Sequence, residues 1–186
     1  DDETSRGLGD VYKRQGWYPS VMTEGIPVVR MYTDSSGHTR FAKMKIPVEA
    51  KTGLGSVGLF SSLLVNKNLE DNKGDVKTQF AVTPVPDNVE GEGPKLAHTA
   101  PRRQLVLSLS GCLEFKSCGV DSEDSEHKVV IRRGDILLAE DLEGEGHVWK
   151  FIEAQDGRFY PWVRCYIHLG DEYEHFVSQL VPLVEH

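Results

Sequence analysis

Short segments in which apolar and polar residues alternate, separated by turn residues, dominate the chain from about residue 26. Residues 27–33 and 38–48 flank a cluster of turn-forming residues and predict a β-hairpin. In the second segment Phe41, Met44 and Ile46 are expected to share an inward-facing role, because the lysines between them belong in water. The first patterned part of the chain is therefore predicted to be β-structure.

The same pattern continues toward the C-terminus, with turn signals at intervals of roughly 8–12 residues. The predicted strands cover residues 76–82, 104–110, 112–116, 127–132, 136–139, 147–152 and 162–168. Residues 59–65, a short apolar run after several glycines, are the exception and are interpreted as one or two short helical turns. The pattern predicts an all-β sandwich or barrel, but it does not separate a jelly roll from an immunoglobulin-like sandwich.

A helix is predicted at the C-terminal end. Asp171 can cap it, and Glu174 three residues later completes a capping box. An apolar stripe with helical spacing follows, formed by Tyr173, Phe176, Val177, Leu180 and Val181. We expect this helix to pack on the outside of the β-domain, with a partner interface as the alternative.

Size and charge limit the classes of function. The chain has 186 residues, which suits one domain, and 39% of them are hydrophobic, which is enough for a core. The formal net charge is −8. Nucleic acid and anionic membranes both need a cationic face, so neither is expected as the main partner.

The cellular compartment follows from the cysteines and from what precedes the patterned region. Three cysteines, Cys112, Cys118 and Cys165, give no disulfide framework. Free thiols in a reducing compartment are the simpler interpretation, and a Cys112–Cys118 pair is the alternative. The sequence contains neither an apolar run of membrane-spanning length nor a basic start followed by an apolar stretch. We therefore expect a cytoplasmic protein.

The first residues differ in character from the rest. Residues 7–15, GLGDVYKRQ, resemble the translated remnant of a sequencing adaptor. Residues 1–16 are therefore expected to be a non-native or disordered tail, and residues 17–186 a single domain.

Two motifs between residues 98 and 147 resemble those of the cupin superfamily. Cupins carry His-x-His, three or four residues, Glu, six residues and Gly, followed later by Gly-Asp, a short strand, a turn and His. Here HTAPRRQ at 98–104 precedes Gly111 by the expected spacing, and Gly-Asp at 134–135 precedes His147. The resemblance implies a cupin double-stranded β-helix, a jelly-roll barrel with a C-terminal α-helix, in a single-domain subgroup with a degenerate metal motif. It also implies a homodimer.

Strand geometry groups the motif residues. Alternate side chains of a strand share a face, so His98, Arg102 and Gln104 have the same parity, as do His147 and Trp149. In cupins the two motif strands face each other. The resemblance therefore implies that His98, Gln104 and His147 meet in the mouth of the barrel.

The motif departs from the family at two ligand positions. Ala100 stands where cupins usually have the second His, and Gln104 stands where they have Glu. The loop before the last motif histidine supplies candidates for a further acid, Glu140 and Asp141. A divalent transition metal, Fe, Mn, Ni or Zn, would then have as its ligands His98, Gln104, His147 and Asp141. The alternative is a metal-free pocket in which both histidines are hydrogen-bonding or acid–base groups.

Other side chains are candidates for the pocket. An inward-facing Arg102 would anchor an anionic substrate, because a guanidinium suits carboxylate or phosphate acceptors. The alternative for Arg102 is an internal salt bridge to Asp135, Glu140 or Asp141. Trp149 and Tyr166 are expected to line the substrate pocket, with core packing as the alternative for each. Of the remaining histidines, His38 and His168 lie on predicted strands and His127 and His175 are interpreted as surface residues.

Two functions stay open. The first is a metal-dependent enzyme acting on a small anionic molecule, with His98, His147 and Arg102 as its catalytic residues. The resemblance implies dioxygenase, lyase, isomerase or decarboxylase chemistry, and without a metal either histidine could still act as a general base. The second is a non-catalytic module that binds or senses a small molecule, which the substitutions Ala100 and Gln104 favour.

Overall fold

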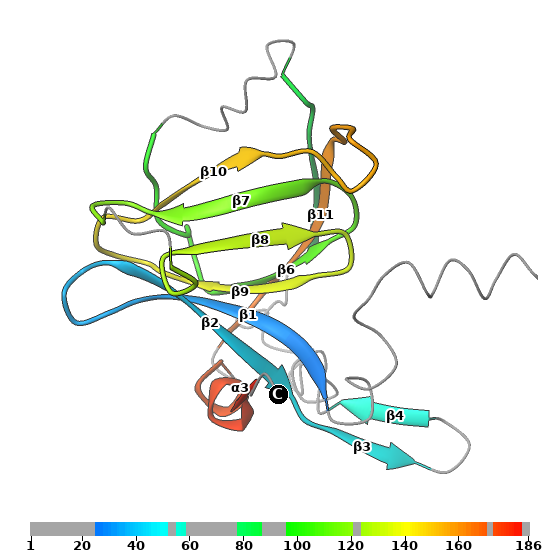
Figure 1. Cartoon of the computed structure of the whole chain (residues 1–186). Coiled ribbons are helices and arrows are strands. Elements are labelled where there is room, and N and C mark those ends of the chain that lie inside the picture. The colour runs from blue at the N-terminus through cyan, green and yellow to red at the C-terminus, as the bar shows by residue number, and fades with distance from the viewer. Residues whose placement is uncertain are drawn as a thin grey trace, which may run out of the picture.

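The computed structural model describes residues 25–51, 55–58, 78–86, 96–120, 124–170 and 173–183, and these confirm the all-β prediction (Figure 1). The predictions for residues 1–16 and 59–65 and for the Asp171 cap lie outside the described residues. The elements are β1 (Ile26–Thr33), β2 (Thr39–Ile46), β3 (Val48–Lys51), β4 (Gly55–Gly58), β5 (Thr78–Thr83), β6 (Gln104–Ser108), β7 (Cys112–Ser117), β8 (Lys128–Arg132), β9 (Ile136–Glu140), β10 (His147–Phe151), β11 (Trp162–His168), α3 (Tyr173–Gln179) and β12 (Val181–Pro182).

The described strands form two main sheets and a small ribbon. The larger sheet has the order β12-β2-β1-β9-β6-β11-β5, the smaller has the order β10-β7-β8, and β3 pairs only with β4. The predicted hairpin is confirmed, because β1 and β2 pair antiparallel along their whole length. The two main sheets face each other (Figure 1), and one apolar cluster with residues from both lies between them.

The antiparallel pairs follow a wrapped order. We number the strands along the chain from β5 and count the short segment at residue 98 as the second strand. The first strand then pairs with the eighth, β5 with β11, and the third pairs with the sixth, β6 with β9. The fourth pairs with the fifth, β7 with β8, and the second meets the seventh through a bridge between His98 and His147. A long hairpin folded over on itself gives this order, and it brings two distant histidines together.

Strands β6 and β9 are buried on both faces. Leu137 and Ala139 of β9 belong to the cluster between the sheets, while Leu138 packs on the outer face with α3. The same alternation corrects one prediction about β2. Phe41 lies between the sheets, whereas Met44 and Ile46 pack under α3, because residues of opposite parity on a strand point to opposite faces.

Helix α3 covers the outer face of the larger sheet, as predicted. Tyr173 and Phe176 of the helix and Leu180 just after it are buried against that sheet. The predicted stripe is wrong at Val181, which is exposed and pairs with β2 as part of β12. Pro182 follows it, and a residue before proline disfavours the helical conformation. Within the described residues, no helix has the length and apolar character needed to cross a membrane.

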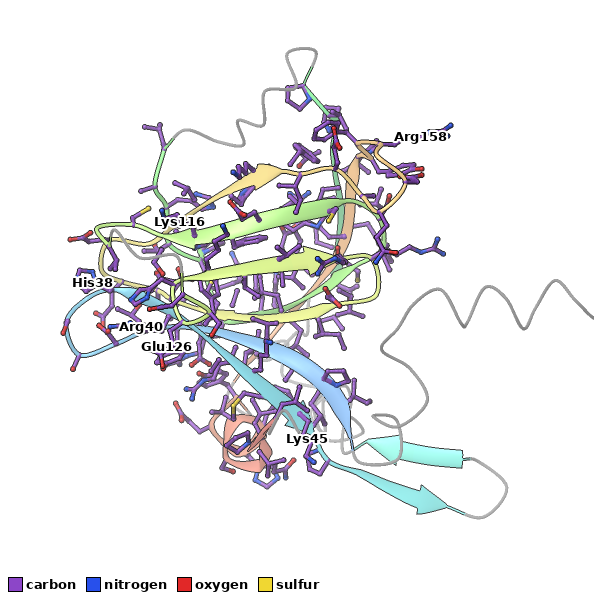
Figure 2. The ribbon with its side chains drawn as sticks, viewed as in Figure 1. His38, Arg40, Lys45, Lys116, Glu126 and Arg158 are labelled. Atoms are coloured by element: carbon purple, nitrogen blue, oxygen red, sulfur yellow. The ribbon has the colours of Figure 1, made fainter. Side chains whose placement is uncertain are left out.

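Two ionic groups support these elements. Glu140, at the end of β9, accepts a bond from Nε of Arg30 at 2.7 Å and another from the hydroxyl of Tyr173. Burial, followed by the bond to Glu140, raises the pKa of Tyr173 above its usual range. The second group is centred on Arg40, at the edge of the sheets (Figure 2). Nη1 of Arg40 lies 3.5 Å from a carboxylate oxygen of Glu126.

The second group corrects the prediction for His127, which is buried rather than on the surface. Its Nδ1 lies 2.6 Å from an oxygen of Asp124, and its Nε2 contacts the guanidinium of Arg40. A histidine with a partner on each nitrogen can be buried at low cost, because neither ring nitrogen loses its hydrogen bond.

The three cysteines are free thiols, as predicted. Cys112 begins β7 and Cys118 follows its last residue, so roughly 20 Å of extended strand separates them, too far for a disulfide. Burial raises the pKa of both thiols, which keeps them protonated and weakly reactive near neutral pH.

Leu138→Ala should lower the free energy of unfolding by about 2–5 kcal/mol, because the side chain is fully buried between β9 and α3. Urea denaturation followed by circular dichroism measures the change. Leu142→Ala is the matched control, since Leu142 is 41% exposed, and it should change stability much less. Equal losses in the two variants would contradict the packing described for α3.

Tyr173 should ionise later than an ordinary tyrosine. Its pKa in the folded protein lies above the unfolded value of about 10, so its contribution to stability is complete below about pH 10 and is lost as the pH rises further. An ultraviolet difference titration of the native protein and of Tyr173→Phe measures this. The variant should lack the last-titrating tyrosine, and superimposable curves above pH 10 would count against the buried bond to Glu140.

Candidate functional site

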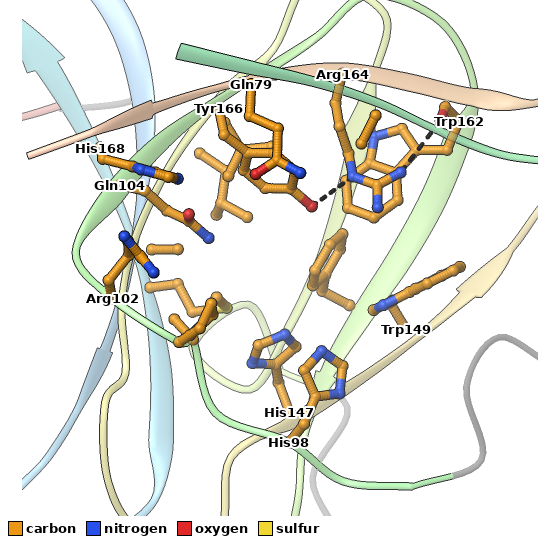
Figure 3. Close-up of a pocket in the computed structure, with 18 residues that line it drawn as sticks. Gln79, His98, Arg102, Gln104, His147, Trp149, Trp162, Arg164, Tyr166 and His168 are labelled. Atoms are coloured by element: carbon orange, nitrogen blue, oxygen red, sulfur yellow. Dashed lines mark hydrogen bonds between the residues drawn. The ribbon is translucent and has the colours of Figure 1, made fainter. Parts of the chain in front are cut away.

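A pocket of about 590 Å³ opens between the two sheets (Figure 3). Strands of both sheets and the segment before β6 contribute to its walls. Among the described residues that line it there is no Asp or Glu. Its polar side chains are Gln79, His98, Arg102, Gln104, His147, Arg164, Tyr166 and His168, and its aromatic walls also include Phe115, Trp149 and Trp162. The volume is typical of a pocket for a small organic molecule.

The pocket brings together most of the residues that the sequence singled out. His98, Arg102, Gln104, His147, Trp149 and Tyr166 all line it, and His168 joins them. Asp141 lies directly behind His147 rather than in the wall. His38 lies beside the turn between β1 and β2 and does not line the pocket, and His175 is exposed on α3.

His98 and His147 form one corner of the pocket. The backbone N–H of each donates to the carbonyl of the other, at 3.1 and 2.9 Å, and their ring centroids are 4.5 Å apart. Gly146 permits this approach: it has a φ of 72°, and a Cβ at that position would lie 2.4 Å from the carbonyl oxygen of His98. The glycine in the loop before the second motif histidine is thus a steric requirement of the corner.

Asp141 is fully buried and its carboxylate accepts three hydrogen bonds. One oxygen accepts from Nδ1 of His147 at 2.7 Å and from the hydroxyl of Thr39 at 3.1 Å. The other lies 3.3 Å from the backbone N–H of Ala100. A buried charge needs such partners, because an unpaired carboxylate in the interior costs several kcal/mol.

The bond from Asp141 sets the orientation of His147. A carboxylate can only accept, so Nδ1 of His147 carries a proton and Nε2 is the nitrogen left for the pocket. The ring is 3% exposed and packs against Phe115 with centroids 5.6 Å apart. A fixed imidazole with an accepting Nε2 is the arrangement that a general base requires.

The opposite wall carries Arg164, which the sequence analysis missed. Its Nε donates to the hydroxyl of Tyr166 at 2.5 Å, and Nη1 donates to the hydroxyl of Thr83 at 2.8 Å. Its Cζ lies 3.9 Å from the ring centroid of Trp162. Figure 3 shows Arg164 and Tyr166 across the pocket from the two histidines. Within the described part of the chain, no acid pairs with this guanidinium.

A signal for Arg164 was present in the sequence. The pocket-lining residues of β11 are Trp162, Arg164, Tyr166 and His168, which share one parity. Tyr166 was predicted to line the pocket, so its neighbours two residues away on the same strand were predictable from the alternation alone.

Arg102 lies in the pocket wall near Gln104 and is exposed (Figure 3). The three acids considered as its internal partners bond elsewhere. Asp135 accepts from the backbone of Arg132, and Glu140 and Asp141 are occupied as described above. Among the described residues Arg102 therefore has no acidic partner, and its role as an anchor for an anion stays a prediction.

The side chains do not assemble into the predicted set of metal ligands. Gln104 lies beside His168 across the β6–β11 ladder, on a different wall from the two histidines in Figure 3. Asp141 bonds to His147 from behind. Among the described residues, no group of three or more His, Cys, Asp or Glu side chains is placed to hold a metal. The metal stays a prediction.

Asp141→Asn should lower the free energy of unfolding by about 1–3 kcal/mol. An amide has one accepting oxygen, so either His147 and Thr39 lose their acceptor or the amide –NH₂ faces the backbone N–H of Ala100, which also donates to the backbone carbonyl of Asp141 at 3.0 Å. Denaturant unfolding measures the loss, and ¹⁵N NMR of the His147 ring reports whether Nδ1 still carries the proton. Glu143→Gln, on the exposed loop, is the control; unchanged stability and an unchanged tautomer in Asp141→Asn would contradict the pairing.

Comparisons with protein-family models, with curated proteins and with solved structures find no match to this chain.

Proposed function

We propose that the protein binds a small organic anion in the pocket between its sheets and that His147, held by Asp141, acts on it as a general base. The observation that carries the proposal is the buried pair His147–Asp141, whose free imidazole nitrogen faces a pocket with two arginines and no acid among its described lining residues. His98, next to His147, is the second proton-carrying group of the same corner.

The fold that we propose for this function is a cupin-type jelly roll. Its support is the wrapped pairing from β5 to β11, in which the outermost strands pair with each other, then the next two, and so on to β7 with β8. This order is that of a long hairpin rolled over on itself, the arrangement of jelly rolls. The resemblance of the motifs that contain His98 and His147 points the same way.

Charge supports the anionic substrate. The protein has a net charge of −8, but the described walls of the pocket contain two arginines and no acid. Positive charge is therefore concentrated at the pocket. Arg164 is held by neutral acceptors, so none of its partners among the described residues cancels its charge. Arg102 at the edge of the same pocket adds a second charge.

A metal-dependent form of the chemistry is the second candidate. Histidines that bind metals commonly donate their other ring N–H to a carboxylate, as Nδ1 of His147 does to Asp141. His98 would be the neighbouring imidazole donor. A bound metal would polarise a carbonyl or activate water. Elemental analysis of the purified protein beside His98→Ala and His147→Ala tests it: about one transition metal per chain, lost in both variants, would establish it.

Proton transfer tests the first candidate directly. Small organic anions that bind are found by ligand-observed NMR and then incubated with the metal-free protein in D₂O, where exchange of a carbon-bound proton reports a general base. His147→Gln should slow this exchange by a factor of about 10²–10⁴ while binding changes little. His175→Gln, on the exposed face of α3, is the control and should exchange as the native protein does.

Two results would count against this proposal. Exchange at the native rate in His147→Gln would remove His147 as the base. Tight binding of several anions with no exchange of any by the native protein would instead support a non-catalytic binding module.

A further inference from the structure

We infer that the pocket is built for an aromatic monocarboxylate, with its carboxylate on Nη2 of Arg164 and its ring on Trp149, the reacting end then lying at His147. This inference rests on the proposed function for the part played by His147. The positions of the carboxylate and the ring rest on the walls of the pocket alone.

The number of free hydrogen-bond donors on Arg164 determines which class of anion can bind to it. Nε is engaged by Tyr166, and Nη1 is engaged by the hydroxyl of Thr83 and the carbonyl of Trp162 at 2.8 and 3.3 Å. Among the described residues only Nη2 is without an acceptor. Both forked edges of a guanidinium include Nε or Nη1, so a bidentate anion finds no free edge here. One oxygen of a singly charged group fits Nη2, whereas a phosphate dianion would find no second free donor on Arg164.

The walls of the pocket favour a flat body. Trp162 is buried under the guanidinium of Arg164 and meets Trp149 with ring centroids 5.2 Å apart. Trp149 and Tyr166 are only half-buried, so their rings have surface open to the pocket. Planar aromatic groups bind well against such surfaces, through stacked or edge-on contacts worth about 0.5–1.5 kcal/mol beyond burial.

The separation of the polar groups requires a body between them. Arg164 and His147 stand on opposite walls in Figure 3. The residues between them are apolar or aromatic, among them Phe115, whose ring meets Trp162 at 5.8 Å on one side and His147 at 5.6 Å on the other. A ligand that reaches both ends has to cross this apolar stretch, and an aromatic ring crosses it without leaving a polar group unpaired.

Four small probes test the inference by isothermal titration calorimetry on the full chain: benzoate, benzamide, cyclohexanecarboxylate and phenyl phosphate. We expect benzoate to bind most tightly. Arg164→Gln should weaken benzoate binding by roughly 10- to 100-fold, the loss of one charge-assisted bond, and leave benzamide unchanged. Arg158→Gln, exposed at the surface (Figure 2), is the matched control and should leave both unchanged.

Two further variants keep the test informative. Arg164→Lys retains the charge in case Arg164→Gln fails to fold, and it should lose part of the benzoate affinity because an ammonium cannot keep the bonds to Tyr166 and Thr83. Trp149→Leu should reduce the preference for benzoate over cyclohexanecarboxylate. Circular dichroism establishes that each variant is folded before its affinity is compared.

The outcomes separate this inference from the proposed function. Benzamide binding as tightly as benzoate, phenyl phosphate binding more tightly, or no benzoate binding at millimolar concentration would each overturn the inference. None of these would affect general-base chemistry on another anion. Conversely, benzoate binding that is retained in His147→Gln and depends on Arg164 would support the inference even if no proton exchange is found.

Discussion

The buried carboxylate of Asp141 is the constraint on which the site depends. It is fully buried, and its three donors come from β2, from the segment before β6 and from β10. These elements belong to both sheets and are far apart in sequence, so the charge is satisfied only when all three have assembled. An interior charge left with fewer bonds costs several kcal/mol, and the corner that carries His98 and His147 is a consequence of satisfying it.

The preceding residue extends this constraint to the other side of the sheet. Glu140, the last residue of β9, lies on the face that α3 covers, whereas Asp141, the next residue, lies on the side of the pocket, behind His147. Glu140 binds Arg30 and Tyr173, which joins α3 to the end of β9. The helix is therefore attached one residue from the group that orients His147, and the position of Asp141 is determined from both faces of the larger sheet.

Much of the fold was predictable because alternation is a local signal. Strand β11 was predicted with its observed bounds, and the motif spacing named His98 and His147, which are 49 positions apart and form one bridge. The sequence could not predict contacts between residues that only the fold brings together. Asp141 was predicted as a metal ligand and lies behind His147, and His127 was predicted at the surface because its bonds to Asp124 and Arg40 have no signature in the chain. Arg164 could have been predicted to line the pocket, because it lies two residues before Tyr166 on the same strand and therefore on the same face.

The environment of Arg164 differs from that of an arginine in a structural ion pair. An arginine that served stability alone would be expected beside an acid, which would cancel its charge. Here hydroxyl and carbonyl oxygens hold the guanidinium, and Trp162 supports its face, so it is fixed in position and keeps its charge. Such an arrangement costs stability as long as no anion is bound, because no acid among the described residues pairs with this partly buried cation. An anionic ligand in the pocket would offset that cost, although the protein as a whole has a net charge of −8. The anionic ligand that we propose therefore follows from the surroundings of Arg164 rather than from the charge of the protein as a whole.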